Sequence, residues 1–295
     1  PHDWRSKTPT IFRATEQWFI SVDREVKGEG KTLREMALNA TDNEIEFIPD
    51  WGKSRLRGML ESRPDWCISR QRSWGLPIPA FMKEGFETLL TQKSVRAVAQ
   101  TVRKEGAGFW FRASVEDILA EYDPAQDEDA PTWLREKGKA GLSELTASQD
   151  IFDVWFESGS SWNAVLKERN LGYPSEYYIE GSDQHRGWFQ LSLLPSLVSQ
   201  GRAPFKSLLT HGFIVDAQGR KMSKSVGNTI NVQDLLDKYG ADISRWWVAS
   251  LNFVNDIKAD WAFFKNAAEE YRKVRNTIRF LLGNLQDYNN ETDRY

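Results

Sequence analysis

Residues 177–210 read YYIEGSDQHRGWFQLSLLPSLVSQGRAPFKSLLT, and the fold class follows from the pattern within them. Residues 177–180 form a short apolar run that ends at Gly181, as expected of a buried strand and its exit turn. Residues 185–200 have helical spacing, with Pro195 as a kink or a break, and residues 205–210 predict a further strand. A strand, a helix and a strand of these lengths indicate a βαβ unit, so we predict an α/β fold with a parallel sheet.

Working outward, the same criteria predict strands over residues 8–22 and 152–156, and helices over residues 31–40, 53–62, 231–239 and 241–251. Residues 261–290 predict one long amphipathic helix that is rich in Arg and Lys. Changes in the pattern along the chain predict four segments, with boundaries at residues 1–79, 80–148, 149–256 and 257–295. The second segment carries helical periodicity and no residue pattern that suggests chemistry.

The composition excludes several classes of protein. The chain has 295 residues, of which 40% are hydrophobic and 27% charged, a balance typical of globular proteins. No stretch approaches the roughly 20 apolar residues of a membrane-spanning helix. The single cysteine, Cys67, excludes an internal disulfide and any zinc site built on several cysteines, which favours a reducing compartment. The net charge of −3 means that contacts with RNA must come from local basic patches.

The most specific motif is the run Lys221-Met222-Ser223-Lys224-Ser225, which lies between Gly219-Arg220 and Gly227-Asn228. We call residues 219–228 the lysine loop. Two lysines three positions apart on a glycine-flanked loop suit a polyphosphate, because each is a compact charge on a flexible stem and loop amides add donors. A solvated basic turn is the alternative for a lysine pair alone, but the five-residue run is far rarer than such a pair.

A second motif lies upstream, in Glu180-Gly181-Ser182-Asp183-Gln184-His185-Arg186-Gly187-Trp188-Phe189. We call residues 180–184 the strand-end turn. In open α/β sheets nucleotides bind where a strand ends and a helix begins. Gly181 permits a close backbone approach, and the polar side chains of the strand-end turn suit a ribose, an adenine or an amino group. The alternative, a helix start capped by Ser182 or Asp183, is compatible with this role.

The lysine run resembles, without a mismatch, the Lys-Met-Ser-Lys-Ser motif of class I aminoacyl-tRNA synthetases. The segment from Gly181 to Trp188 resembles isoleucyl-tRNA synthetases in particular. Further similar stretches are residues 8–19, 65–75, 153–159, 209–213 and 240–243. The chain departs from the family in one respect. The family's His-x-Gly-His motif is missing, because the only histidines are His2, His185 and His211.

The resemblance implies the second half of a Rossmann-like, parallel-sheet nucleotide-binding domain. In this interpretation residues 1–79 follow the family's editing insertion, and residues 80–148 are a small α/β connective insertion. Residues 149–256 hold the second half of the catalytic domain, and residues 257–295 begin a helical anticodon-binding domain. The non-Met start at Pro1 and the missing motif lead us to expect a piece of a longer chain that is inactive when isolated.

The resemblance also assigns roles to individual residues. Lys221 and Lys224 are expected to be catalytic. Contacts with ATP or the adenylate are expected from Glu180, Gly181, Asp183, Gln184, His211 and Lys224. Trp155 and Trp188 are expected to line the amino-acid pocket, with core packing as the alternative. Candidate RNA contacts, with a solvated surface as the alternative for those in the C-terminal helix, are Arg70, Arg72, Arg272, Lys273, Arg275 and Arg279.

The implied function is that of an isoleucine–tRNA ligase, in which isoleucine, ATP with Mg²⁺, and tRNA(Ile) take part. We further expect a cytoplasmic protein that does not contact a membrane, supplies no metal site of its own and is monomeric at full length. Two alternatives stay open. The chain could come from a valyl or leucyl enzyme that shares the lysine motif, or it could be a non-catalytic tRNA-binding module that has kept the fold.

Overall fold

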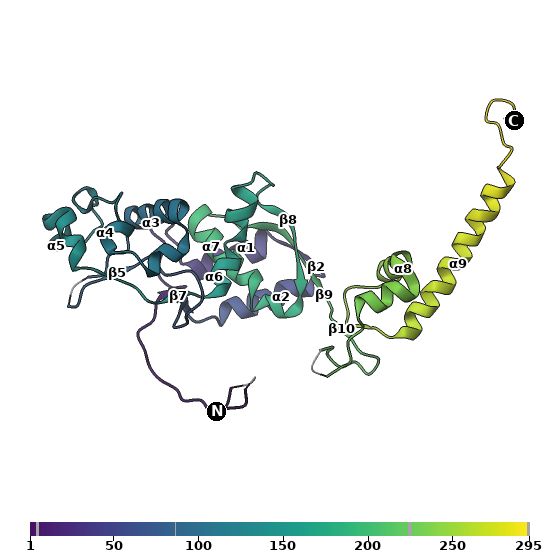
Figure 1. The fold of residues 1–295 in the computed structure, drawn as a ribbon, viewed down its shortest axis with the longest axis horizontal. Coiled ribbons are helices and arrows are strands. Elements are labelled where there is room, and N and C mark those ends of the chain that lie inside the picture. The colour runs from purple at the N-terminus through teal and green to yellow at the C-terminus, as the bar shows by residue number, and fades with distance from the viewer. Residues whose placement is uncertain (4–5, 86, 224–225, 294–295) are drawn as a thin grey trace. The chain divides into compact units, whose positions relative to one another are not determined.

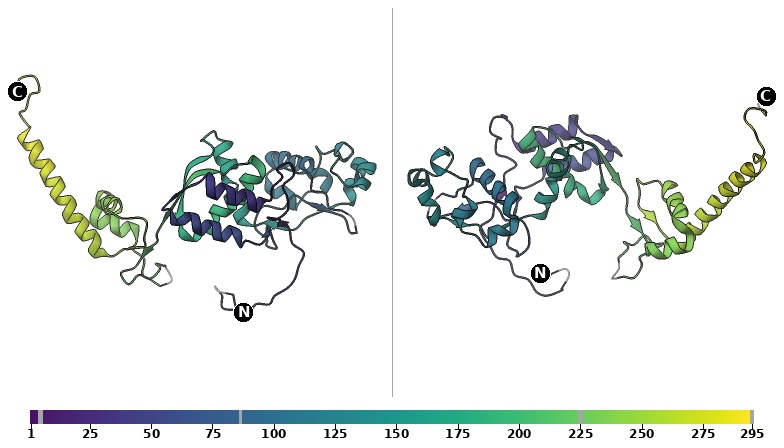
Figure 2. Two further views of the ribbon diagram at one scale, coloured as in Figure 1. Left: turned by 180° about the vertical axis from the view of Figure 1, so that it is seen from behind. Right: turned by 45° about the horizontal axis from the view of Figure 1, so that its top comes forward.

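The computed structural model describes residues 1–3, 6–85, 87–223 and 226–293 (Figure 1). The chain forms two compact units. Unit 1 contains residues 1–45, 55–175 and 185–206, and unit 2 contains residues 46–54, 176–184 and 207–295. The chain therefore passes between the units several times, and the strand-end turn and the lysine loop both belong to unit 2. Figure 2 gives two further views of the same ribbon.

Unit 1 combines short antiparallel strand pairs with helices. The strand β1 (Phe19–Ile20) pairs with β3 (Trp66–Cys67), β4 (Ser69–Arg70) with β7 (Ile151–Phe152), and β5 (Phe81–Met82) with β6 (Thr146–Ala147). The helices of this unit are α1 (Leu33–Asn43), α3 (Gln92–Glu105), α4 (Val115–Ile118), α5 (Thr132–Lys137), α6 (Val154–Gly159) and α7 (Trp188–Gln200). Helix α2 (Trp51–Glu61) crosses the boundary between the units. Shorter 3-10 turns include η1 (Ala107–Phe111), η2 (Pro124–Gln126) and η3 (Gly138–Glu144), and η4 (Trp162–Lys167) is a π-helix.

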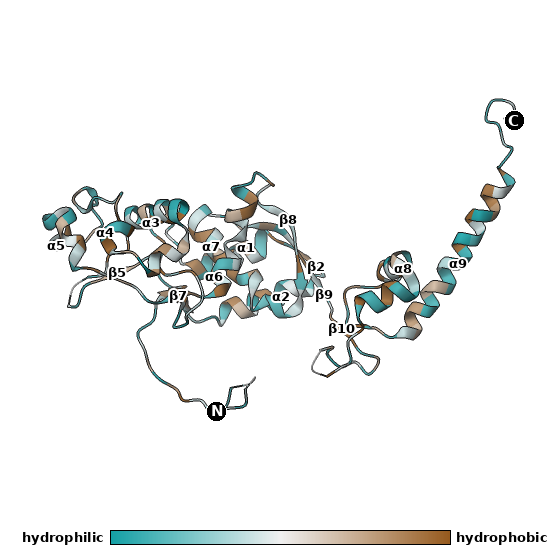
Figure 3. Cartoon of the chain, in the orientation of Figure 1, coloured by the Kyte–Doolittle hydropathy of each residue, from teal (hydrophilic) through white to brown (hydrophobic). Residues whose placement is uncertain are grey.

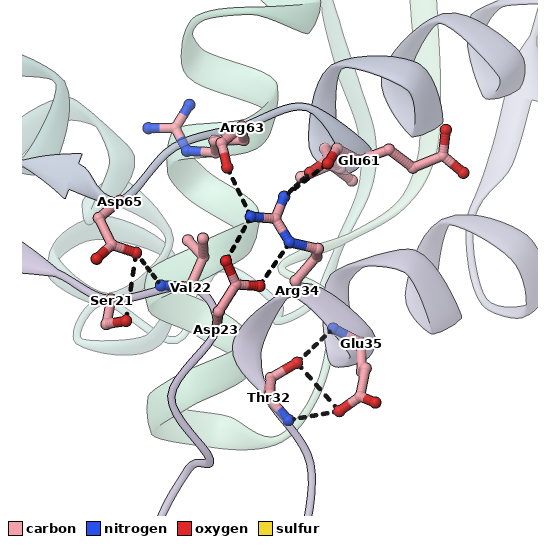
Figure 4. Close-up of polar contacts among 10 residues, drawn as sticks. Ser21, Val22, Asp23, Thr32, Arg34, Glu35, Glu61, Arg63 and Asp65 are labelled. Carbon is pink, nitrogen blue, oxygen red and sulfur yellow. Dashed lines mark hydrogen bonds and ion pairs between the residues drawn. The ribbon is translucent and has the colours of Figure 1, made fainter.

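Helix α1 begins at a capping box and is anchored by one arginine (Figure 4). Thr32 accepts a hydrogen bond from the Glu35 amide at 3.2 Å, and the Glu35 carboxylate accepts from the Thr32 amide at 2.8 Å. The Arg34 guanidinium pairs with both oxygens of Asp23 at 2.7 and 2.8 Å. It also donates to the carbonyls of Leu60, Glu61 and Arg63. Arg34 therefore ties α1 to the end of α2 and to the segment that enters β3.

Residues 81–145 bury a hydrophobic core of their own. Its members come from β5, α3, α4 and α5 and the turns between them, and include Phe81, Leu89, Trp110, Leu119 and Leu134. Helix α3 starts at Thr91, whose hydroxyl donates to buried Asp127 at 2.5 Å. Tyr122 donates to the same carboxylate oxygen at 2.7 Å, so two hydroxyl groups satisfy one oxygen of this buried acid.

Unit 2 is built on a three-stranded sheet in the order β2-β9-β8, formed by β2 (Glu46–Ile48), β8 (Ser175–Gly181) and β9 (Phe205–His211). Strands β2 and β9 are parallel, with Phe47 opposite Leu208. The chain runs from β8 through the turn η5 (Ser182–His185) and α7 into β9, which is the predicted order of strand, helix and strand. The observed fold is a mixed α/β fold with parallel strand pairing, as the sequence predicts.

The rest of unit 2 follows β9. Strand β10 (Ile214–Val215) pairs in parallel with β11 (Ile257–Lys258), and the helices are α8 (Val232–Ala249) and α9 (Trp261–Asn284). Gly240 has a non-helical backbone inside α8 (φ 81°, ψ 168°), so α8 is two helical segments joined at a kink, close to the two predicted helices. A small core joins α8 to the start of α9, and Figure 3 shows hydrophilic and hydrophobic residues interleaved along α9.

Two predicted strands are wrong in extent. Of residues 8–22, only β1 (Phe19–Ile20) is strand, because the other pairing of this segment among the described residues is an isolated bridge between Pro9 and His2. Of residues 152–156, only Phe152 is strand; Asp153 accepts a hydrogen bond from the Trp155 amide and so starts α6. The predicted helices over 31–40, 53–62 and 185–200 are confirmed as α1, α2 and α7, with ends that differ by a few residues.

Candidate functional site

The lysine loop is held at its base by Asp216, which directly follows β10. One oxygen of the Asp216 carboxylate accepts from the amides of Gln218 and Arg220 at 3.0 and 2.8 Å. The other accepts from the Arg220 guanidinium at 2.9 Å and from the Asn228 side chain at 3.0 Å. These contacts, led by the Asn228 hydrogen bond, lower the pKa of Asp216 to about 2. The residue is 5% exposed, so its charge depends on these donors.

Asn228 closes the other side of the lysine loop. Its amide nitrogen donates to Asp216 and to the Lys221 carbonyl at 3.2 Å, and its side-chain oxygen accepts from the Ser223 amide at 2.9 Å. Gly227 has a φ of 72°, a left-handed conformation that glycine adopts without strain. One asparagine side chain therefore fixes the backbone of the lysine loop at two points and ties it to Asp216.

Of the two lysines of the motif, Lys221 lies within the described residues. The Lys221 side chain is exposed, and within the described ranges its ammonium makes no hydrogen bond or ion pair. It is therefore available to an anion. Lys224 and Ser225 lie outside the described residues.

The strand-end turn lies beside the segment that leads into the lysine loop. A Cβ atom at Gly181 would lie 2.8 Å from ring carbons of Phe213 and 3.0 Å from a carboxylate oxygen of Asp183. A side chain at Gly181 would therefore displace the Phe213 ring, and Phe213 stands three residues before Asp216. Gln184 donates to Asp183 at 3.0 Å, and Glu180 and Asp183 are exposed at the end of β8. The Asp183 carboxylate and the Phe213 ring thus both lie beside Gly181.

His211 and Gly212 end β9 close to the chain before β11. Nδ1 of His211 lies 2.8 Å from the Gly212 carbonyl oxygen, which can only accept. Nδ1 is therefore the donor of this hydrogen bond, and in the neutral ring Nε2 is the acceptor. A Cβ atom at Gly212 would lie 2.2 Å from the carbonyl carbon and oxygen of Asn255, so this close approach of two backbones requires glycine.

Trp155 and Trp188 both belong to unit 1, where α6 meets α7. The indole nitrogen of Trp188 donates to the Ser158 carbonyl at 2.9 Å, which ties the start of α7 to the helix that carries Trp155. Trp155 is 37% exposed. A Cβ atom at Gly159 would lie only 1.9 Å from the Leu191 carbonyl oxygen, so α6 and α7 are in backbone contact.

The candidate RNA contacts fall into two groups. In unit 1 the Arg70 guanidinium is occupied by Asp153 at 3.0 Å and by the carbonyls of Cys67 and Ser69, whereas Arg72 is exposed. In unit 2, Arg272 and Arg275 line a cavity of about 710 Å³ with Lys238 and the Gly240 kink, which we call the basic cavity. The acid of this cavity, Asp242, accepts from the Tyr271 hydroxyl at 2.9 Å, which raises the pKa of Tyr271. The cavity suits an anion.

Three features of the candidate site were not predicted from the sequence: the Asp216–Asn228 pair, the ring of Phe213 and the Gly240 kink that lines the basic cavity. An Asp followed by Gly three residues later, as in Asp216 and Gly219, is a turn pattern that could have indicated the role of Asp216.

None of the helices in the described ranges combines the length and apolar character that crossing a membrane requires. Across those ranges, no group of three or more His, Cys, Asp or Glu side chains is placed to hold a metal ion.

Comparison with known proteins gives a consistent result. Residues 3–260 match the family model of tRNA synthetases class I (I, L, M and V). The chain is 48% identical over 296 residues to an isoleucine–tRNA ligase of Acinetobacter baylyi, covering 99% of this chain and 29% of the relative. For the isoleucine–tRNA ligase of Kosmotoga olearia the identity is 49% over 290 residues, covering 98% and 29%. For that of Thermotoga maritima it is 47% over 296 residues, covering 100% and 30%. The chain thus spans about 30% of the length of these relatives.

The fold is also similar to a solved structure. Agrobacterium radiobacter K84 agnB2 LeuRS, in a ternary complex with tRNA and LeuAMS, matches with a TM-score of 0.52 and 18% identity, covering 75% of this chain and 28% of that one. At this identity the likeness concerns the fold alone.

Proposed function

Since this chain belongs to the class I tRNA synthetases, we propose that the protein that contains it is an isoleucine–tRNA ligase, which uses ATP to join isoleucine to tRNA(Ile). Identities of 47–49% to isoleucine–tRNA ligases over almost the whole chain support isoleucine over valine or leucine. The reaction is proposed for the whole protein, because the chain spans about 30% of the length of its relatives. We propose a monomer that acts in the cytoplasm.

The first step activates the amino acid. The isoleucine carboxylate attacks the α-phosphorus of ATP, a carboxyl oxygen–phosphorus bond forms, and the bond to the β-phosphate breaks to release pyrophosphate. Negative charge grows on the leaving pyrophosphate, and preorganised cations lower the energy of that state. We assign this role to Lys221 and Lys224. The ammonium of Lys221 supports the assignment, because it is exposed and has no hydrogen-bond or ion-pair partner among the described residues. Mg²⁺ would enter with the ATP phosphates, which share its coordination.

The strand-end turn is proposed to hold the adenylate. Glu180, Asp183 and Gln184 offer acceptors and one amide donor for the ribose and the amino group, and the backbone of Gly181, beside the Phe213 ring, is proposed to contact the ligand. His211 is proposed to contact the nucleotide through Nε2. The observation that carries this proposal is the ring of Phe213, which lies against Gly181 and belongs to the segment leading into the lysine loop.

The amino-acid pocket is proposed to use Trp155 and Trp188. Aromatic side chains give an aliphatic group a large apolar contact area. The hydrogen bond from Trp188 to Ser158 and the α6–α7 backbone contact support a fixed pair of walls, because both tryptophans belong to helices that cannot shift independently. In the second step, a hydroxyl of the terminal tRNA ribose attacks the activated carbonyl, and AMP leaves.

The tRNA is proposed to contact Arg72, Arg272 and Arg275, whose side chains are exposed or line the basic cavity. Arginine and lysine contacts with phosphates supply most of the affinity for nucleic acid and position it without reading its sequence. Arg70, which the sequence also suggested, would act by fixing the neighbouring backbone through its three partners.

Amino-acid-dependent exchange of pyrophosphate into ATP by the whole protein tests the proposal. Isoleucine is expected to support exchange far better than valine or leucine, and Lys221→Ala and Lys224→Ala are each expected to lower it at least tenfold with an unchanged melting temperature. Lys265→Ala, an exposed lysine on α9, serves as the matched control. Exchange that prefers valine or leucine, or tRNA binding without any exchange, would overturn the assignment to isoleucine.

A further inference from the structure

Trp74 is the most exposed tryptophan of the described residues, with 92% of its surface accessible. Together with Phe111, which is 51% exposed, it lines a cavity of about 530 Å³ in unit 1. We call this the Trp74 cavity. Its mainly apolar lining also includes Leu76, Ala107 and Gly108, and its polar lining residues are Ser73 and Glu157. Single exposed apolar residues are common on protein surfaces, whereas two exposed aromatic rings at one cavity indicate a binding site.

The backbone that carries Trp74 is fixed although its side chain is not packed. A Cβ atom at Gly75 would lie 2.5 Å from Cδ1 of Ile151, so the turn lies tightly against β7. The Leu76 amide donates to the Glu157 carboxylate at 3.3 Å, and the Phe152 amide donates to the Leu76 carbonyl at 2.8 Å. The indole of Trp74 is therefore held outward by an anchored turn, which lowers the entropy cost of binding.

The backbone that carries Phe111 is also anchored, through the neighbouring residue Trp110. It is the last residue of η1, and its neighbour Trp110 is 4% exposed. The indole nitrogen of Trp110 donates to the Ser148 carbonyl at 3.0 Å. The buried Trp110 thus anchors the turn from which Phe111 reaches the cavity.

The polar groups around the Trp74 cavity decide what kind of flat ligand suits it. A second cavity of about 330 Å³ shares Trp74, Gly75 and Glu157 with it and is also lined by Arg72. Arg72 is exposed and forms no ion pair within the described ranges, so it can meet a phosphate. Glu157 is an acceptor within reach of both cavities, and a carboxylate accepts well from the exocyclic amino group of cytosine or adenine.

We propose that the Trp74 cavity binds an unpaired, amino-bearing nucleobase of an RNA, stacked on Trp74 and Phe111, with the adjoining phosphate at Arg72. Single-stranded nucleic acid is bound in this way, by aromatic platforms beside cations. The identity of the RNA rests on the proposed function, in which the natural ligand is an unpaired segment of a tRNA. The stacking site itself rests only on the side chains of unit 1.

Binding of fluorescent RNA tetramers to the chain tests the proposal. Trp74→Ala is expected to weaken binding of a cytidine tetramer about tenfold, and Phe111→Ala by a comparable factor, because stacking contributes this much per base. Trp74→Phe keeps a ring and should retain most of the affinity. Phe280→Ala removes an aromatic ring of α9 that is 69% exposed and does not line the cavity, so it should bind as the unsubstituted chain does.

Two further variants test the polar groups. Arg72→Ala should reduce the slope of log affinity against log salt concentration by about 0.7, the value for one phosphate on a single strand, whereas exposed Arg103→Ala should leave the slope unchanged. Glu157→Gln keeps the acceptor for Leu76 but adds a donor, so the preference for a cytidine over a uridine tetramer should narrow.

Unchanged affinity in both Trp74→Ala and Phe111→Ala, or an equal loss in Phe280→Ala, would overturn the proposal. The result is separate from the ligase assignment. If isoleucine fails to support exchange but tetramer binding still depends on Trp74, the ligase proposal falls and the stacking site stands. If exchange depends on isoleucine but Trp74→Ala leaves tetramer binding unchanged, the ligase proposal stands and the stacking site is excluded.

Discussion

The Asp216 carboxylate and the Asn228 amide are joined by a hydrogen bond of 3.0 Å that closes the base of the lysine loop. Asp216 stands before the lysine motif and Asn228 after it, and Asn228 also bonds the backbone at Lys221 and Ser223. Side chains that hold a catalytic loop in place contribute to rate without touching the substrate, because misplaced charges stabilise a transition state poorly. We therefore regard both as positioning residues for Lys221.

Asn228→Ala is expected to lower isoleucine-dependent pyrophosphate exchange at least tenfold. The variant frees the Ser223 amide and the Lys221 carbonyl, so Lys221 no longer starts from a fixed backbone. The loss should appear in kcat more than in the KM for isoleucine. Gln218→Ala, which changes another exposed side chain between β10 and the motif, should retain exchange within about twofold. Equal effects of the two substitutions would contradict the positioning role.

Asp216 should make stability depend on acid pH. Its folded pKa of about 2 lies below its ordinary value of 3.8, so the carboxylate stabilises the folded state fully above about pH 4. This contribution is lost as the pH falls from 4 toward 2, because protons then bind the unfolded chain first. The difference in melting temperature between the native chain and Asp216→Asn should be largest above pH 4 and shrink below it. A difference that is constant from pH 6 to pH 3 would exclude this linkage.

Gly159→Ala is expected to destabilise unit 1 by about 2 kcal/mol or more, because the added methyl group would lie 1.9 Å from the Leu191 carbonyl oxygen. Gly58→Ala provides the control. Gly58 lies inside α2 with open space at its Cβ position, and alanine there should stabilise the helix by about 0.5–1 kcal/mol. Urea denaturation of both variants measures the change in unfolding free energy, which should be negative for Gly159→Ala and positive for Gly58→Ala.

Arg34→Ala is expected to cost about 2–3 kcal/mol of unfolding free energy. The Arg34 side chain is 19% exposed, and its loss leaves three main-chain carbonyls without their charged donor. Exposed Arg55→Ala on α2 should change stability by less than about 0.5 kcal/mol. Circular dichroism in urea measures the unfolding free energy of both variants. If Arg34→Ala lowers it as little as Arg55→Ala does, water satisfies Asp23 and the three carbonyls in the variant.

The basic cavity of unit 2 predicts a salt effect. Arg272→Ala combined with Arg275→Ala should reduce the slope of log tRNA affinity against log salt by about 2, one for each phosphate lost. Lys265→Ala lies on the same helix outside the cavity lining and should leave the slope unchanged. Filter binding of tRNA between low and moderate salt provides the measurement. A uniform drop in affinity with the native slope would argue against phosphate contacts.

Local patterns predicted the helices and the βαβ order well, because α7 and β9 are delimited by their own periodicity and by Gly201 and Pro204. The prediction of strands over residues 8–22 was wrong in extent because strand formation there depends on distant residues. The composition of this segment favours strands, but a strand needs a partner. Pro9 forms only an isolated bridge with His2, and Phe19 and Ile20 form their ladder with Trp66 and Cys67, far along the chain. Such pairing is non-local and cannot be inferred from composition.

The candidate site shows the same division. The lysine motif and the strand-end turn could be identified from contiguous residues. The Asp216–Asn228 bond joins residues twelve positions apart through a loop geometry that no spacing rule specifies. The approach of Phe213 to Gly181 joins segments separated by a helix and a strand. The sequence therefore predicted which groups carry charge, and the fold determines which neighbours hold them.

The close approach at Gly212 limits how the protein can vary. Even one methyl group at this position would collide with the backbone at Asn255, and no rotamer change can relieve a clash with main-chain atoms. Among the glycines, Gly58 can drift to other residues, whereas alleles altered at Gly212 should be lost from any lineage that needs the protein. A saturation library would therefore show a single tolerated codon family at Gly212.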